Sequence, residues 1–126
     1  MNFPENLKYT ADHEWLKIEG KKGTVGITDH AQGELGDVVY IDIADDIAFV
    51  KAGDTFGTIE AVKTVADMLA PVSGKVIDVN RSLNDHPEVI NSDPYGEGWI
   101  IEIELTNPSE LDELLDVKAY KELIGQ

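Results

Sequence analysis

The residues best suited to chemistry lie in one short run of the sequence, and the most useful group in it is the amine of Lys63. The run has a Gly-Asp pair at positions 53 and 54, alternating apolar segments on either side of Lys63, and Ala-Pro-Val-Ser-Gly at positions 70–74. Alternation predicts two strands, and the outer turn residues bound them, so we expect a β-hairpin with Lys63 at or near its tip. The tip lacks the Asn-Gly or Asp-Gly that a two-residue turn favours, which indicates that turn geometry alone did not select it.

The Lys63 side chain has two interpretations at this level. Its amine, on a flexible four-carbon stem, is a suitable acceptor for a carboxylic cofactor, and acylation would remove its charge. Local physics alone favours the other interpretation, a solvated strand lysine that discourages pairing at a sheet edge. The sequence beyond this hairpin is needed to distinguish the two interpretations of Lys63.

Composition excludes several classes of protein. The 126 residues include 25 Asp and Glu, 10 Lys and Arg and no Cys, which gives a formal charge of −15. Without cysteine there is no disulfide framework, thiolate zinc site or thiol catalysis, so any sulfur chemistry must be imported. The negative charge makes nucleic acids and membrane surfaces poor partners and, through self-repulsion, favours a monomer. The first residues resemble neither a secretory signal nor a transit peptide, which predicts a cytoplasmic protein, although a matured organellar protein would look the same.

The elements that must position Lys63 are mostly strands. Period-two patterns predict strands over 14–19, 24–27, 38–43, 55–61, 64–69, 75–79 and 99–105. In the third of these, Val39, Ile41 and Ile43 are expected to share the buried face. Strands at this spacing predict an all-β sandwich or flattened barrel, and the length fits one domain.

Helices are expected to be short and peripheral. Thr28 is placed to cap a short helix over 29–34 that Gly36 ends. Ser109 is placed to cap a C-terminal helical segment over 109–124. The histidines at 13, 30 and 86 have no metal-ligand spacing and no cysteine to join them, so no metal site is predicted.

The run around Lys63 resembles the swinging-arm hairpin of lipoyl and biotinyl carrier domains. Biotinyl domains usually have Met on both sides of the lysine, whereas Val62 and Thr64 stand here, which favours the lipoyl type. Four further segments, at 8–16, 25–32, 35–40 and 90–100, resemble the H-protein family of the glycine cleavage system in its own order. His-Glu-Trp at 13–15 and Pro-Tyr-Gly-Glu-Gly-Trp at 94–99 are not general to lipoyl domains, which makes this resemblance specific. The departures are small, at Gly33, Glu34 and Ala70.

The resemblance implies a fold and a cofactor. The fold would be a lipoyl/biotinyl-type hybrid barrel-sandwich with short peripheral helices, forming one lipoyl-carrier domain over 1–126 with its hairpin at about 53–74. Lys63 would bear lipoate in amide linkage, and the lipoyl dithiolane would be the imported sulfur. The chain would be a non-catalytic carrier whose task is to keep one group at high effective concentration among several active sites.

The resemblance also implies partners. A pyridoxal-phosphate glycine decarboxylase would load the aminomethyl group of glycine on the arm, and a tetrahydrofolate-dependent aminomethyltransferase would unload it. Dihydrolipoamide dehydrogenase would then reoxidise the arm, and lipoate-attaching enzymes would install it.

Further site residues are expected near the arm. Glu60, three residues before Lys63, matches a position that lipoate-attaching enzymes are thought to read, although it also fits an ordinary outward-facing strand carboxylate. Because the loaded arm carries a cationic amine, Glu14 and Asp67, together with Asp12, are hypothesised to form a cleft that holds it away from water. His13 is added to this group of expected site residues because its neighbours in the sequence match those of the family.

Three alternatives stay open from the sequence. One is a lipoyl or biotinyl domain of a 2-oxoacid dehydrogenase or a carboxylase, although such domains are usually tethered by an Ala/Pro-rich linker that this sequence lacks. The others are a metal-dependent hydrolase built on the His and Asp residues, which a chelator should inactivate, and an unmodified β-sandwich binding protein.

Overall fold

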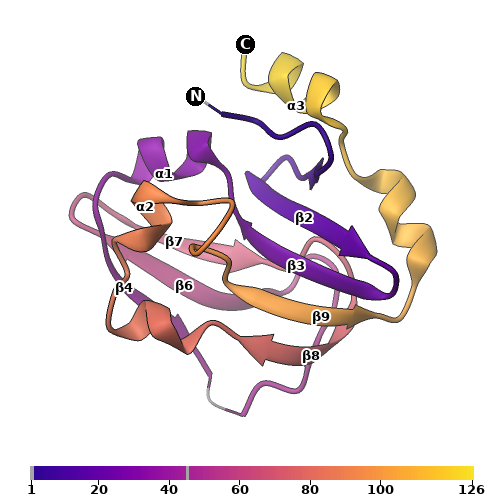
Figure 1. Cartoon of the computed structure of the whole chain (residues 1–126), viewed down its shortest axis with the longest axis horizontal. Coiled ribbons are helices and arrows are strands. Elements are labelled where there is room, and N and C mark those ends of the chain that lie inside the picture. Colours follow the sequence, from indigo (N-terminus) through magenta and orange to yellow (C-terminus); the bar gives the residue numbers. More distant parts are fainter. Residues whose placement is uncertain (1, 45) are drawn as a thin grey trace.

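The part of the chain that the structure describes folds mainly as antiparallel β-sheet, with nine strands. The computed structural model describes residues 2–44 and 46–126. The strands are β1 Lys8–Tyr9, β2 Glu14–Glu19, β3 Lys22–Ile27, β4 Val38–Ile43, β5 Phe49–Val50, β6 Thr55–Ala61, β7 Val65–Leu69, β8 Gly74–Val79 and β9 Ile101–Leu105. They form a six-stranded sheet of order β1-β2-β3-β9-β8-β5 and a three-stranded sheet of order β4-β6-β7, and every pairing is antiparallel (Figure 1). The predicted all-β sandwich class is confirmed.

The hydrophobic core lies between the two sheets. Both sheets contribute buried side chains to one cluster, among them Leu16, Val25 and Ile103 from the large sheet and Ile59 and Met68 from the small one. Each of these side chains is at most 1% exposed. Burial of one face of each sheet is what the period-two pattern predicts, and it fixes which residues of β6 and β7 face outward.

Strand boundaries follow the predicted ones closely in the middle of the chain. The bounds of β2, β4 and β6 are as predicted, and those of β7 and β8 differ by one residue at their starts. β3 begins at Lys22, which pairs with Glu19 at the end of β2, so the turn between the two strands has only two residues. β9 begins at Ile101 instead of Trp99, because the Trp99 amide donates to Gly96 O and closes a turn. The two-residue strands β1 and β5 were not predicted, because two residues show no periodicity.

The expected face of β4 is wrong at one position. Val39 is 50% exposed, whereas Val38, Ile41 and Ile43 are buried. The register between β4 and β6 shifts between Val38 and Tyr40, which marks a β-bulge. An extra residue in one strand moves the following side chains to the other face, so period two does not hold across this position.

The first helix, α1 Asp29–Leu35, forms as predicted. Thr28 caps it by accepting a hydrogen bond from Ala31 N at 3.1 Å, and Gly36 ends it with its N–H donating to Gln32 O. Two short elements were not predicted, the 3₁₀ helix η1 Arg81–Asn84 and the one-turn helix α2 Val89–Ser92. None of the helices in the described parts of the chain is long and apolar enough to cross a membrane.

The C-terminal segment is helical in two pieces. A 3₁₀ helix, η2 Pro108–Glu113, precedes α3 Val117–Leu123. The predicted cap at Ser109 is wrong, because this residue lies inside η2 and its hydroxyl donates to Asn107 Oδ1 instead. Asp116 caps α3 by accepting from Ala119 N at 2.8 Å.

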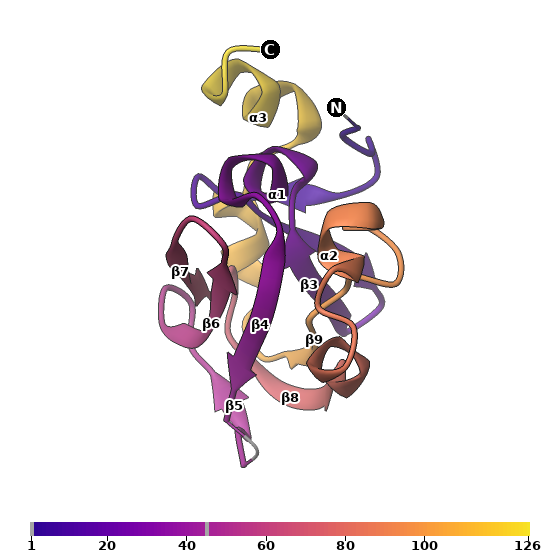
Figure 2. The ribbon, with the colours of Figure 1, turned by 90° about the vertical axis from the view of Figure 1, so that its left-hand side faces the viewer.

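The C-terminal segment packs on the N-terminal one. A second core cluster contains Phe3, Leu7, Tyr9, Trp15 and Tyr120. Tyr9 and Leu115 exchange two backbone hydrogen bonds, each of 2.8 Å. α3 therefore lies at the same end of the molecule as the N-terminus and α1 (Figure 2).

Candidate functional site

Lys63 lies at the exposed tip of the β6–β7 hairpin. Ala61 N donates to Thr64 O at 2.8 Å, so Val62 and Lys63 form the turn between the strands. Val62 N donates to Asp37 O at 3.0 Å, which fixes the tip to the segment that follows α1. The Lys63 amine is therefore displayed on a rigid support, in solvent.

Gly36 provides space for the stem of Lys63. Its φ of +79° lies in the region that favours glycine, and a Cβ placed there would lie 3.7 Å from Lys63 Cδ. Asn91 of α2 holds this segment, because its Nδ2 donates to Gly36 O at 2.8 Å and its Oδ1 accepts from Val38 N at 2.9 Å. The segment that follows α1 therefore supports the hairpin tip, and α2 holds that segment in place.

Glu60 lies on the outer face of the small sheet. It pairs with Tyr40 of β4 on one side and with Val65 of β7 on the other, so the three side chains form a row across the sheet. Tyr40 is 50% exposed, Val65 is 61% exposed and Glu60 is exposed too. A protein that binds this face would meet one carboxylate between two apolar side chains, one residue in from the tip.

A cavity of about 150 Å³, here called the β7 cavity, brings the other expected site residues together. Its polar lining is Asp12, His13, Glu14, Glu34 and Asp67, and its apolar lining is Ile27, Ala31, Leu35, Ile59, Ala66 and Met68. Asp67 is four residues from Lys63 along β7, a distance of about 13 Å at the rise of a strand. The cavity therefore lies on the same hairpin as the lysine, at a distance that the lysine covers only when its amine carries a further extended group.

Glu14 is the buried acid of this cavity. Its side chain is 3% exposed, Oε1 accepts from the Thr10 hydroxyl at 2.8 Å, and Oε2 accepts from Leu69 N at 3.2 Å. The bond to Leu69 joins the large sheet to the small one. Burial raises the pKa of Glu14 to about 7, against the lowering effect of these two hydrogen bonds. A buried carboxylate with such a pKa gains from a cationic partner.

His13 forms another wall and has an unusual backbone. Its φ of +69° is the only positive φ among the non-glycine residues that the structure describes. The ring Nδ1 lies 2.9 Å from the hydroxyl of Tyr120, and the ring of His30 lies 4.9 Å away between centroids. Burial, followed by the charge of His30, lowers the pKa of His13, so the ring is neutral at neutral pH.

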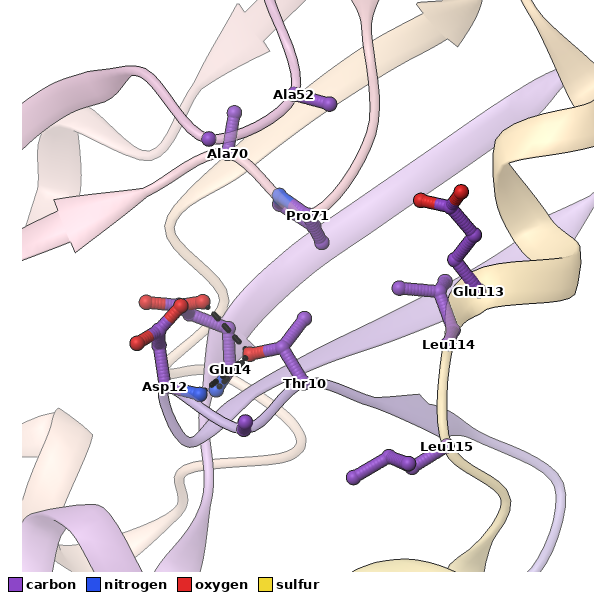
Figure 3. Close-up of a pocket in the computed structure, with 11 residues that line it drawn as sticks. Thr10, Asp12, Glu14, Ala52, Ala70, Pro71, Glu113, Leu114 and Leu115 are labelled. Carbon is purple, nitrogen blue, oxygen red and sulfur yellow. Dashed lines mark hydrogen bonds between the residues drawn. The ribbon is translucent and has the colours of Figure 1, made fainter.

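A second cavity of about 380 Å³ also has Glu14 in its lining (Figure 3). Glu14 and Asp12 line both cavities, while Pro71 and Leu114 line only the second. Ala70, another lining residue, is seven positions from Lys63, about 23 Å along a strand. Of the two cavities, the β7 cavity is therefore the one that suits an arm on Lys63.

Sequence reasoning missed several residues of the site. Glu34 belongs to the β7 cavity, and His30 Nε2 lies 3.8 Å from its Oε1. The i, i+4 spacing of His30 and Glu34 on the helix was a signal that they share a face. Tyr120 gave no such signal, because it meets His13 only through tertiary packing. Thr10 meets Glu14 within a local turn, in which its hydroxyl also accepts from Asp12 N and Glu14 N. Among the described residues, no group of three or more His, Asp or Glu side chains is arranged to hold a metal ion.

Comparisons with known proteins agree on one family. A sequence model described as "Glycine cleavage H-protein" matches residues 7–126. The glycine cleavage system H protein of Bacteroides fragilis is 50% identical over 125 residues, which are 99% of this chain and 99% of the relative. That of Chlorobium limicola is 53% identical over 128 residues and covers 100% of both chains. A crystal structure of a glycine cleavage system H protein from Mycobacterium marinum superposes with a TM-score of 0.89 at 38% identity, over 98% of this chain and 100% of that one.

Proposed function

The chain belongs to the glycine cleavage H-protein family, and from this membership we propose that it carries lipoate in amide linkage on Lys63. The observation that supports the assignment most directly is the exposed lysine at the tip of a rigid hairpin that also lines a cavity. Lipoate supplies a disulfide that accepts an aminomethyl group and is reoxidised after the group has left. The chain itself supplies display, reach and shelter, and we propose no catalytic residue in it.

The proposed task is to carry the aminomethyl group of glycine between enzymes. The pyridoxal-phosphate glycine decarboxylase loads it, the tetrahydrofolate-dependent aminomethyltransferase unloads it, and dihydrolipoamide dehydrogenase restores the arm. Tethering on one flexible arm raises the effective concentration of the group at each active site. Because the net charge is −15, self-repulsion favours a monomer that meets these partners in turn.

We propose that the β7 cavity holds the loaded end of the arm. Its apolar lining suits the hydrocarbon and sulfur atoms, and Glu14 and Asp67 suit the primary ammonium. Asp12 and His13 line the same cavity and, with Glu34, complete its polar side. Holding the ammonium here keeps water from the carbon that joins sulfur and nitrogen.

The mass of the intact protein tests the assignment. Protein purified from its native host is expected to show one lipoyl-sized increment, and fragmentation is expected to place that increment on Lys63. A biotin-sized increment, or none when lipoate is abundant, would overturn the lipoyl assignment.

We further propose that Glu60 is read by the lipoate-attaching enzyme. Replacing Glu60 with alanine is expected to lower the initial rate of lipoylation about tenfold, because the enzyme loses a polar contact next to the lysine. Asp42, also exposed on β4, offers the matched control as Asp42→Ala. Equal lipoylation rates for the Glu60 variant and the wild type, measured by mass spectrometry over time, would leave Glu60 as an ordinary strand carboxylate.

A further inference from the structure

The hydroxyl of Tyr120 joins three segments that are far apart in the sequence. It lies 2.9 Å from His13 Nδ1 and 2.8 Å from Thr28 Oγ1. Tyr120 belongs to α3, His13 to the turn before β2, and Thr28 to the N-terminus of α1. The Tyr120 side chain is 0% exposed, and its hydroxyl does not line the β7 cavity.

The ring of Tyr120 is held firmly. It stacks on Tyr9 with centroids 4.7 Å apart and an interplanar angle of 9°, and it meets the edge of Phe3 at 5.8 Å. A buried ring with two aromatic neighbours has little freedom to move its hydroxyl. The hydroxyl is therefore a fixed point for the groups that bond to it.

Both partners of this hydroxyl control a wall of the β7 cavity. His13 lines the cavity itself, and Thr28 caps α1, which contributes Ala31, Glu34 and Leu35 to the lining. The backbone at His13 is in the left-handed region, which costs energy for a residue other than glycine and persists only when its surroundings hold it. The bond to Tyr120 is one of those restraints, together with the bond from Thr28 N to His13 O at 3.0 Å.

One direction of donation satisfies all three groups. Thr28 Oγ1 accepts from Ala31 N and is able to donate its own proton to Tyr120. In that arrangement the Tyr120 proton goes to His13 Nδ1, which requires a neutral imidazole with its own proton on Nε2. The reverse direction would leave the Thr28 proton without an acceptor among these three groups. Burial and His30 keep the pKa of His13 below its usual value, which agrees with a neutral ring.

We propose that Tyr120 is a positioning residue for the carrier arm: its hydroxyl fixes the orientation and tautomer of His13 and the start of α1, and so the shape of the β7 cavity. This inference rests on the proposed role of that cavity in holding the loaded arm. It gives the C-terminal helix α3 a part in the site, although α3 does not line the cavity.

The test compares two matched tyrosine variants. Tyr120→Phe removes the central hydroxyl and keeps the stacked ring. Tyr9→Phe removes a hydroxyl from the other ring of the same stack, where it donates to Pro4 O at 2.6 Å and contacts neither His13 nor Thr28. Tyr9→Phe loses one hydrogen bond and Tyr120→Phe loses two, both from rings that are 0% exposed, so Tyr9→Phe controls for the removal of a buried hydroxyl from this stack.

The first measurement uses the unmodified chain. Nitrogen NMR of the His13 ring is expected to show the Nε2–H tautomer in the wild type and in Tyr9→Phe, and a mixture of tautomers in Tyr120→Phe. The variant His13→Asn assigns the signal, and asparagine tolerates the left-handed backbone. An unchanged His13 signal in Tyr120→Phe would overturn the inference, whatever the arm does.

The second measurement uses the loaded carrier. Hydrolysis of the loaded arm by one water gives the free thiol, formaldehyde and ammonium, and its half-life is expected to fall about fivefold in Tyr120→Phe and less than twofold in Tyr9→Phe. Adding Tyr120→Phe to His13→Asn is expected to shorten the half-life no further if the tyrosine acts through the histidine. A relaxed tautomer with a wild-type half-life would also overturn the inference. Failure of the cavity role itself shows separately, as a wild-type half-life in Glu14→Gln.

Discussion

Replacing Lys63 with arginine is expected to abolish glycine-dependent turnover in a system reconstituted from the carrier and the three enzymes proposed as its partners. Arginine keeps the positive charge and most of the stem, but its guanidinium is not an acceptor for lipoate. Because Lys63 is exposed at the hairpin tip, the substitution is expected to change the free energy of unfolding by less than about 0.5 kcal/mol. The loss of turnover would therefore be chemical and not structural.

Lys51 offers the control for this experiment. It is also exposed, and it lies before the turn at Gly53, at the opposite end of the hairpin from Lys63. Lys51→Arg is expected to retain full turnover and the full lipoyl mass increment. Turnover above background in Lys63→Arg, measured as glycine-dependent reduction of NAD, would mean that another residue carries the arm.

Replacing Glu14 with glutamine is expected to have two opposite effects. In the loaded carrier, loss of the charge-assisted bond to the ammonium should shorten the half-life of the arm about tenfold. In the unmodified protein, the same change should raise stability at pH 8 by about 1–3 kcal/mol, because a buried charge with no cationic partner is removed. Calorimetry of the unmodified chain and ammonia release from the loaded chain measure the two effects.

The pH dependence of Glu14 has a definite sign. The folded protein holds its proton up to a pKa of about 7, above the ordinary value of 4.5. Since the folded state binds the proton more tightly, this group lowers stability as pH rises from about 4.5 to about 7, by about 3 kcal/mol at most. Glu14→Gln should flatten that slope. In the loaded wild type, the ammonium favours the charged form of Glu14 and so moves its pKa below 7. The protection of the loaded arm from water should therefore weaken only when the pH falls below 7 and acid protonates Glu14.

Asp67 provides a graded comparison. Its carboxylate lines the β7 cavity but is exposed, so Asp67→Asn should shorten the half-life only about twofold to threefold and leave stability within about 0.5 kcal/mol. If Glu14→Gln matched the wild type in half-life, the ammonium would not be held at this cavity. If Asp67→Asn had the larger effect, the exposed acid would be the main contact.

The sequence predicts the parts of this fold that depend on local pattern. Alternating residues locate β2, β4 and β6 at their observed bounds, and Thr28 and Gly36 locate α1, because one cap and one glycine decide where a short helix begins and ends. The bulge at Val39 was not predictable, because the extra residue is defined only by the partner strand β6.

The residues of the site also divide into those that local sequence predicts and those that depend on tertiary packing. The hairpin and its lysine follow from the run around Lys63, and Glu14 and Asp67 were named from the charge that the arm would carry. Burial of Glu14 beneath Leu69 comes from packing of one sheet on the other, and nothing near Glu14 in the sequence encodes it. Tyr120 joins His13 across 107 positions, a separation that no spacing rule covers.

The order of strands in the large sheet affects when, during folding, the protein becomes able to accept lipoate and to protect the loaded arm. β6 and β7 are joined by three residues, so the hairpin that displays Lys63 can form early from local contacts. β3 pairs with β9, with Lys22 opposite Glu104, so the large sheet closes only after most of the chain has been made. The bond from Leu69 N to Glu14 needs both sheets in place. Attachment and shelter are thus expected to arise at different stages, and a folding defect that delays sheet closure should yield carriers that accept lipoate but lose their cargo to water.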